Sequence, residues 1–206
     1  MLANIITDLT DRLDELSSNW WFLLIIFGIA LLDSVIPVVP SETTVIIGGV
    51  AAGQGNQNIA LVILAGASGA FCGDNLAYFI GDRFRGRVEA WADRKPSRRA
   101  RLDGAARQIR KRGGMLLITA RFIPGGRTIL TLSSGVTNQP HRWFAGWIAI
   151  ATVVWASYAG LLGYLFGQTF ENDHTIAFWL AFATALAISG LIELVRWLRE
   201  RRRTAH

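Results

Sequence analysis

Cysteine and charge are both scarce in this chain of 206 residues. The single cysteine, Cys72, excludes an intrachain disulfide and any site built on paired cysteines. Only 17% of the residues are charged, whereas a soluble domain has about 25%. No Asp, Glu, Lys or Arg occurs in residues 17–32, 43–73 or 143–170. Because a hydrocarbon core about 30 Å thick needs about 20 apolar residues per helical crossing, these runs predict an all-α integral membrane protein. They exclude an ordinary soluble domain and a disordered chain.

The net charge of +6 comes from two basic segments. Residues 82–112 hold twelve Lys and Arg against four acids, and residues 196–203 hold five more Arg. By the positive-inside rule both segments, and with them the C-terminus, face the cytoplasm. Both flank apolar spans and neither resembles a nucleic-acid module, so we expect the basic loop to attract anionic lipid headgroups and not nucleic acid.

The alternation of apolar and polar segments predicts eight parts along the chain. They are an interfacial amphipathic helix (1–19), a first broken or re-entrant hairpin (20–58), a transmembrane helix (59–81), a basic cytoplasmic loop (82–113), a second re-entrant hairpin (114–139), two transmembrane helices (143–167 and 176–198) and a basic tail (199–206). The side of the N-terminus stays open, because the first 19 residues carry one Arg and four acids and so give no positive-inside signal.

Residues 114–136 cannot cross the membrane a single time. The two spans that follow lead from the cytoplasm out and back to the basic tail, so this segment crosses either zero or two times. Its centre holds Arg121, Pro124, Gly125, Gly126 and Arg127. A re-entrant hairpin that enters from the cytoplasm and turns at the Pro-Gly-Gly sequence meets this condition. It would hold two arginines at membrane depth, where each costs about 2.5–3.5 kcal/mol on insertion scales.

The N-terminal half repeats this design, because Asp33, Pro37, Pro40 and Glu42 interrupt the apolar residues of 20–58. One crossing separates the two hairpins, so they would enter from opposite faces as an inverted repeat, which is the usual construction of secondary transporters. A shift of 86 residues aligns Gly49-Val50 with Gly135-Val136, and Tyr78-x-x-Gly81-x-x-Phe84 with Tyr164-x-x-Gly167-x-x-Phe170.

The span 59–81 carries small residues at every fourth position, which lets helices approach closely in a membrane. They are Ala65, Gly69, Gly73, Ala77 and Gly81. We favour packing against the protein's own hairpins over a dimerisation face, and a homo-oligomer stays open. For Asp74, in the same span, a proton-coupling or gating role and a structural role are equally open. We favour His141, beside Pro140, as an interface residue over a proton relay.

The pattern resembles the DedA family, also called SNARE-associated or VTT-domain membrane proteins, over about residues 20–170. The matching residues are Asp33-x-x-x-Pro37-x-x-Pro40-x-Glu42, Gly66-x-x-x-Ala70-x-x-Gly73-Asp74-x-x-x-Tyr78-x-x-Gly81, Arg121-x-x-Pro124-Gly125-Gly126-Arg127, Gly135, Trp155 and Gly163-Tyr164-x-x-Gly167. The resemblance implies a lipid transporter of the bacterial cytoplasmic membrane, which moves polyprenyl phosphate or phosphatidylethanolamine and in several members needs the proton motive force. It implies essential acids at Asp33 and Glu42 and essential arginines at Arg121 and Arg127.

The chemistry of these four residues suits a phosphorylated lipid. A phosphate monoester carries about −1.5 to −2 charges, and arginine offers a planar cation that binds phosphate through two hydrogen bonds. We expect Arg121 and Arg127 to bind the headgroup, and Asp33 and Glu42 to pair with them when no lipid is present. Pro37, Pro40, Pro124, Gly125 and Gly126 would shape the hairpin turns. No catalytic residue, metal or cofactor is expected.

Other functions stay open at this stage. The chain could be an energy-independent scramblase of glycerophospholipids, or an assembly subunit in which the four charged residues only hold the hairpins together. An intramembrane lipid phosphatase is disfavoured, because the three histidines, at positions 141, 174 and 206, are scattered. The identity of the lipid and the direction of transport are also open.

Overall fold

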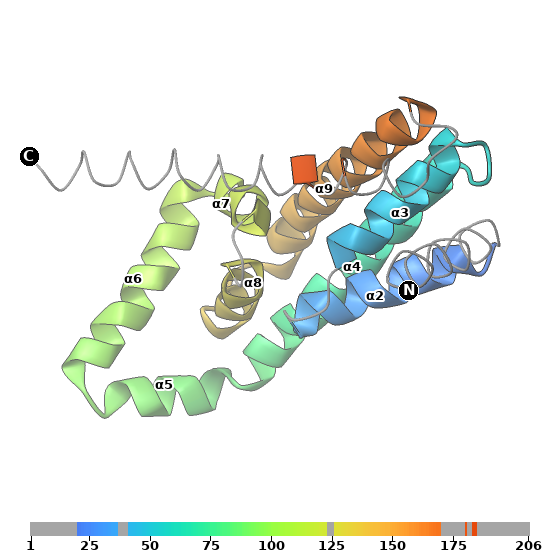
Figure 1. Ribbon diagram of the computed structural model, residues 1–206. Helices are drawn as coiled ribbons and strands as arrows, with labels where there is room; N and C mark the ends of the chain where they lie inside the picture. Colours follow the sequence, from blue (N-terminus) through green and yellow to red (C-terminus); the bar gives the residue numbers. More distant parts are fainter. Residues whose placement is uncertain (1–19, 37–40, 123–125, 170–179, 181–182, 185–206) are drawn as a thin grey trace, which may run out of the picture. The chain divides into compact units, whose positions relative to one another are not determined.

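A computed structural model describes residues 20–36, 41–122, 126–169, 180, 183 and 184. Every element in these ranges is a helix, which confirms the predicted all-α class (Figure 1). The elements are α2 (Phe22–Val35), α3 (Ser41–Gly53), α4 (Ile59–Arg83), α5 (Arg85–Asp93), α6 (Pro96–Arg112), α7 (Met115–Thr119), the 3-10 helix η1 (Ala120–Phe122), α8 (Gly126–Val136) and α9 (His141–Thr169). The predicted amphipathic helix 1–19 and basic tail 199–206, and all but three residues of the predicted span 176–198, lie outside the described residues.

Among the described helices, two are long and apolar enough to cross a membrane. They are α4, with 25 residues, and α9, with 29 residues, and they contain the predicted spans 59–81 and 143–167. Helix α2 is also apolar but has only 14 residues. About 20 residues are needed for a crossing, so α2 alone is too short for one.

The described helices belong to two compact units. Of the described residues, 20–26, 41–65 and 156–169 belong to one unit, and 27–36, 66–122 and 126–155 belong to the other. Helices α2, α4 and α9 each contribute residues to both units.

In the first unit, α3 packs closely on the C-terminal part of α9. Gly163 lies against the backbone of Ile46, and Gly167 lies against the backbone of Val50, so a Cβ atom at either glycine would overlap main-chain atoms. A Cβ atom at Gly53 would lie 2.9 Å from the backbone nitrogen of Gln168. Backbones that approach this closely gain dispersion contacts where hydrophobic burial gives no driving force between helices.

In the second unit, the glycines of α4 contact the backbones of two other helices. Gly69 lies against Phe27 of α2, Gly73 lies against Leu31 of α2, and Gly81 lies against Leu132 of α8. Helices α2 and α8 of the same chain therefore pack against the small residues of α4. We had favoured this packing from the spacing of the small residues.

One pattern of backbone contacts occurs in both units. A Cβ atom at Gly135 of α8 would meet the Tyr78 carbonyl and the Asp82 nitrogen of α4, and one at Gly53 of α3 would meet the matching atoms of Tyr164 and Gln168 in α9. Tyr164 follows Tyr78 by 86 residues, but Gly135 follows Gly53 by only 82. By these contacts, Gly53 of α3 corresponds to Gly135 of α8. The sequence alignment had paired Gly49 with Gly135, so the two correspondences differ by one helical turn of α3.

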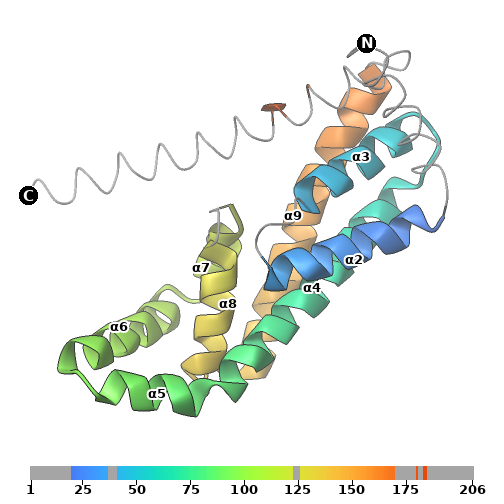
Figure 2. The same cartoon turned by 60° about the horizontal axis from the view of Figure 1, so that its bottom comes forward.

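The basic segment forms a pair of helices, α5 and α6, that contact each other and α8 (Figures 1 and 2). Helix α6 begins with Pro96 in its first turn, after Lys95 in an extended conformation, and ends at Gly113 with φ of +60°. Proline at a helix start and glycine just after its end are common, because proline lacks an N–H donor and glycine tolerates positive φ. The sequence pattern had predicted a basic cytoplasmic loop here, without assigning helices to it.

The connection between α8 and α9 is held on α4 by side-chain hydrogen bonds. The Tyr78 hydroxyl donates to the Gln139 carbonyl at 2.5 Å, and His141 Nε2 lies 2.8 Å from Asn75 Oδ1. Asn75 Nδ2 donates to the Phe71 carbonyl, so the two polar atoms of this amide contact two different segments. The contact of Asn75 with His141 links the start of α9 to α4. Beside it, Tyr78 belongs to a buried apolar cluster with Leu117, Phe144 and Ile148.

Candidate functional site

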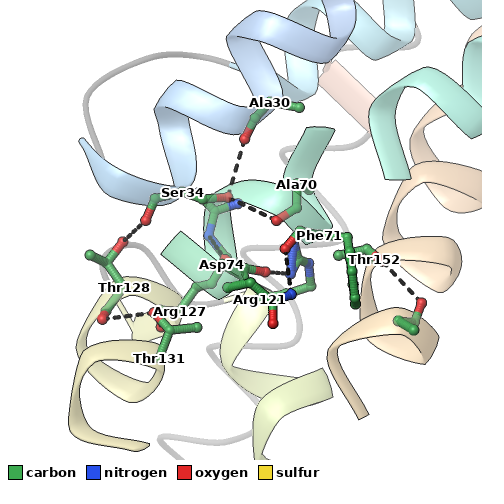
Figure 3. A network of polar contacts seen from close by, with 12 residues as sticks. Ala30, Ser34, Ala70, Phe71, Asp74, Arg121, Arg127, Thr128, Thr131 and Thr152 are labelled. Atoms are coloured by element: carbon green, nitrogen blue, oxygen red, sulfur yellow. Dashed lines mark hydrogen bonds and ion pairs between the residues drawn. The ribbon is translucent and has the colours of Figure 1, made fainter. Parts of the chain in front are cut away.

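Four charged side chains meet in the second unit, from four different elements. Arg121 comes from η1, Arg127 from the first turn of α8 and Asp74 from α4 (Figure 3). Asp33 comes from the last turn of α2. Two arginines and two aspartates sum to no net formal charge. A neutral cluster can be buried at far lower cost than any one of its charges alone.

Arg121 and Asp74 form the most buried pair of the cluster. Arg121 Nη1 donates to Asp74 Oδ2 at 2.5 Å, and the two side chains are 1% and 0% exposed. The guanidinium carbon of Arg121 also lies 5.5 Å from the centre of the buried Trp155 ring, within the range of a cation–π contact.

Arg127 connects both aspartates. Its Nη2 lies 3.1 Å from Asp33 Oδ2, and its Nε lies 3.8 Å from Asp74 Oδ1. Asp74 consequently lies between the two guanidinium groups, and each of its oxygens faces a different arginine. The Arg127 side chain is 12% exposed, so it is more accessible than Arg121.

The start of α8 also binds the end of α2. Arg127 Nη2 donates to the Asp33 carbonyl at 2.6 Å, and the Thr128 hydroxyl lies 3.5 Å from the Ser34 carbonyl. The last four carbonyls of a helix have no partner within it, so these contacts complete the C-terminus of α2. The buried Ser34 hydroxyl, which lies 3.3 Å from the Ala70 carbonyl, ties the same end of α2 to α4.

Several polar atoms of the cluster are buried and have no hydrogen-bond partner in the described residues. They are Nε and Nη2 of Arg121, Nε of Arg127 and Oδ1 of Asp74. Leaving a buried donor unsatisfied costs about 1–3 kcal/mol, and more for a charged group. Three of the four atoms are guanidinium nitrogens, so the cluster as a whole offers donors to an anion.

The structure brings together four of the five charged residues that the sequence singled out. The expected pairing of an arginine with Asp33 is present at Arg127, whereas the partner of Arg121 is Asp74. Glu42 lies in the first turn of α3, in the other unit. Pro37, Pro40, Pro124 and Gly125 lie outside the described residues, and Gly126 is the first residue of α8.

Sequence reasoning missed Ser34 and Thr128. Both are small polar residues that directly follow a charged residue of the site, Asp33 and Arg127 respectively. That position was the only available signal, because the carbonyl groups they contact carry no sequence information. In the described residues that were searched, no group of His, Cys, Asp and Glu is arranged to hold a metal ion.

Comparison with known proteins gives relatives along nearly the whole chain. The Escherichia coli protein DedA is 26% identical over 99% of this chain and 97% of its own length. An uncharacterized membrane protein of Synechocystis is 27% identical over 93% of this chain and 90% of its own length. Undecaprenyl phosphate transporter A of Bacillus subtilis is 24% identical over 86% of this chain and 89% of its own length. No solved structure matches the chain.

A family model described as the VTT domain matches residues 39–165, which is more than half of the chain. The matched residues include α3, α4, α8 and both arginines of the charged cluster. The chain therefore belongs to the VTT-domain, or DedA, family of membrane proteins.

Proposed function

We propose that this protein carries a phosphorylated lipid, polyprenyl phosphate in the first place, across the cytoplasmic membrane of a bacterium. Arg121 and Arg127 bind the phosphate headgroup, and Asp74 and Asp33 hold the two arginines when no lipid is bound. The observation that carries this proposal is the set of buried guanidinium nitrogens without a hydrogen-bond partner. The name of one relative, undecaprenyl phosphate transporter A, supports the substrate class.

The donors of the arginines suit a phosphate group. Arg121 uses Nη1 for Asp74, which leaves Nε and Nη2, on one edge of the guanidinium, for a second acceptor. Phosphate offers three strong acceptor oxygens, and arginine binds it bidentately through such an edge. Two guanidinium groups also match the charge of about −1.5 to −2 on a monoester. The prenyl tail would stay in the lipid while the headgroup is carried by the site.

An exchange of partners provides the transport step. When phosphate binds the arginines, Asp74 and Asp33 lose part of their charge compensation. Asp74 is the main candidate for coupling to protons, because it faces both arginines and is 0% exposed. The family pattern marks Glu42 as essential. Because Glu42 lies on α3, it would interact with partners other than Arg121 and Arg127.

The architecture proposed for this step is an inverted repeat of two re-entrant hairpins, each followed by a transmembrane helix, with a further transmembrane helix at the C-terminus. The matching backbone contacts of α8 on α4 and of α3 on α9 support a duplicated unit. The basic residues of α5 and α6 support an orientation in which the C-terminal end of α4 faces the cytoplasm.

Reconstitution in vesicles tests the proposal. Purified protein should move fluorescent polyprenyl phosphate between leaflets, and Arg121→Gln and Arg127→Gln should each slow this movement by about tenfold or more. Arg142→Gln is the matched control, because Arg142 is an exposed arginine at the start of α9 outside the cluster. Unimpaired movement in both cluster variants would contradict the assignment.

The same vesicles separate the alternatives. Equal movement of phosphatidylcholine and polyprenyl phosphate, insensitive to a proton gradient, would indicate a scramblase. Selective movement of phosphatidylethanolamine would indicate that this lipid, and not a phosphate monoester, is the substrate. Release of inorganic phosphate from the lipid would indicate a phosphatase.

A further inference from the structure

The helices α5 and α6 present basic side chains that the charged cluster does not use. Arg107, Arg110 and Lys111 of α6 are all exposed and stand at positions i, i+3 and i+4. Residues at this spacing lie on one face of a helix. On another face of α6, Ala106 and Ile109 are buried, which is consistent with its contacts to α7 and α8. The basic face therefore points away from the packed side of the helix.

The acids near this face are already engaged. Asp93 lies 3.0 Å from Arg99 Nη1, and Asp103 lies 3.3 Å from Arg99 Nε. The hydrogen bond to Asp93 and the charge of Asp103 raise the pKa of Arg99 above its ordinary value. Among the ion pairs of the described residues, none involves Arg107, Arg110 or Lys111. The positive charge of the face is thus concentrated in these three residues, and Arg99 adds little to it.

The position of the helices favours a membrane surface as the partner. Helix α5 begins two residues after α4, which is long and apolar enough to cross a membrane, so the α5–α6 pair is tethered at the end of that helix. Trp91 of α5 is 51% exposed, and the guanidinium carbon of Arg98 lies 4.3 Å from the centre of its ring. Exposed tryptophan beside basic residues is typical of segments at the level of lipid headgroups.

We propose that Arg107, Arg110 and Lys111 form a docking surface for the anionic phospholipid headgroups of the membrane that holds the protein. The partner is the lipid surface and not the transported lipid, so the surface can exist whether or not the proposed transport is correct. Basic residues next to a transmembrane helix are attracted by the negative potential of the cytoplasmic leaflet, which extends about one Debye length, roughly 10 Å at 0.1 M salt.

A spin label on α6 tests this surface in the full chain. Cys72→Ser removes the single cysteine, and Ala100→Cys places a label at an exposed position, seven residues before Arg107 and on the same face. The accessibility of the label to a water-soluble nickel complex is measured in nanodiscs of phosphatidylcholine alone and with added phosphatidylglycerol. We expect a several-fold lower accessibility with phosphatidylglycerol, and a return to the higher value at high salt.

Variants identify the residues responsible. The combined change Arg107→Gln, Arg110→Gln and Lys111→Gln should remove the difference between the two lipid compositions. Arg142→Gln is the matched control and should keep the difference, because Arg142 is an exposed arginine of α9, outside this basic face. Equal accessibility of the label in both lipids for the unaltered basic face would overturn the proposal. So would a difference that survives the triple change, or protection by added RNA or an acidic protein in phosphatidylcholine alone.

Discussion

Arg121 and Asp74 are 47 residues apart in the chain, yet Nη1 of the arginine lies 2.5 Å from Oδ2 of the aspartate. Both side chains are almost fully buried, at 1% and 0% exposure. A buried pair of this kind contributes little net stability compared with apolar residues, but removing one partner leaves an uncompensated charge. The pair therefore predicts opposite results for single and double changes.

The single change Asp74→Asn should lower the free energy of unfolding by about 3–5 kcal/mol, because it leaves the charge of Arg121 buried without compensation. Unfolding in detergent micelles, followed by circular dichroism, measures the loss. Asp103→Asn is the control, since the pair of Asp103 with Arg99 is about half exposed and such surface pairs contribute little to stability. An equal loss of unfolding free energy in Asp74→Asn and Asp103→Asn would show that the buried pair contributes no more to stability than the exposed pair.

The double change Asp74→Leu with Arg121→Met separates stability from transport. Apolar residues of similar size in place of a buried ion pair are often neutral or stabilising, so the free energy of unfolding should return to within about 1 kcal/mol of the original. Transport of polyprenyl phosphate should nevertheless be lost, because the headgroup has lost a guanidinium. A stable double variant that transports at the original rate would assign the pair a purely structural role.

Close backbone packing makes Gly81→Ala destabilising. The added methyl group would overlap the Leu132 carbonyl of α8, and overpacking of this kind costs about 1–3 kcal/mol. Gly146→Ala in α9 is the control, because nothing lies within 4 Å of its added carbon and alanine favours the helix by about 0.5–1 kcal/mol. In thermal unfolding, the midpoint temperature of Gly81→Ala should be lower than that of the original protein, and the midpoint temperature of Gly146→Ala should be higher. A stabilised Gly81→Ala variant would mean that α4 and α8 are further apart than described.

Loss of one hydroxyl at Tyr78 should loosen the connection between α8 and α9. Tyr78→Phe leaves the carbonyl of the buried Gln139 without its donor, at a cost of about 1–3 kcal/mol. Tyr164→Phe is the control, because the Tyr164 hydroxyl accepts an exposed hydrogen bond from Gln168 that water can replace. Hydrogen exchange of the amides near Gln139 should increase in the first variant alone. An unchanged exchange rate there would show that the hydroxyl does not hold the connection.

Charge and hydropathy predicted the long helices, because a run without charged residues leaves few alternatives to a buried or membrane-spanning helix. The cost of Arg121 and Arg127 in an apolar segment also identified them as candidate site residues. The pairing of Arg121 with Asp74 could not be predicted, since it depends on how far η1 and α4 are rotated about their own axes. The same limit applies to the register of the repeat, where Gly53 and not Gly49 matches Gly135, one helical turn away.

Transport of labelled polyprenyl phosphate by the Arg121→Gln variant tests the central claim most directly. The variant keeps a polar but shorter side chain, and it removes the cation together with the Nε and Nη2 donors of the proposed headgroup site. The account predicts a loss of rate of about tenfold or more, as expected when a charge-assisted hydrogen bond worth about 1.5–3 kcal/mol is removed. The Arg142→Gln control should transport at the original rate. A folded Arg121→Gln protein that transports as fast as the original would contradict the account.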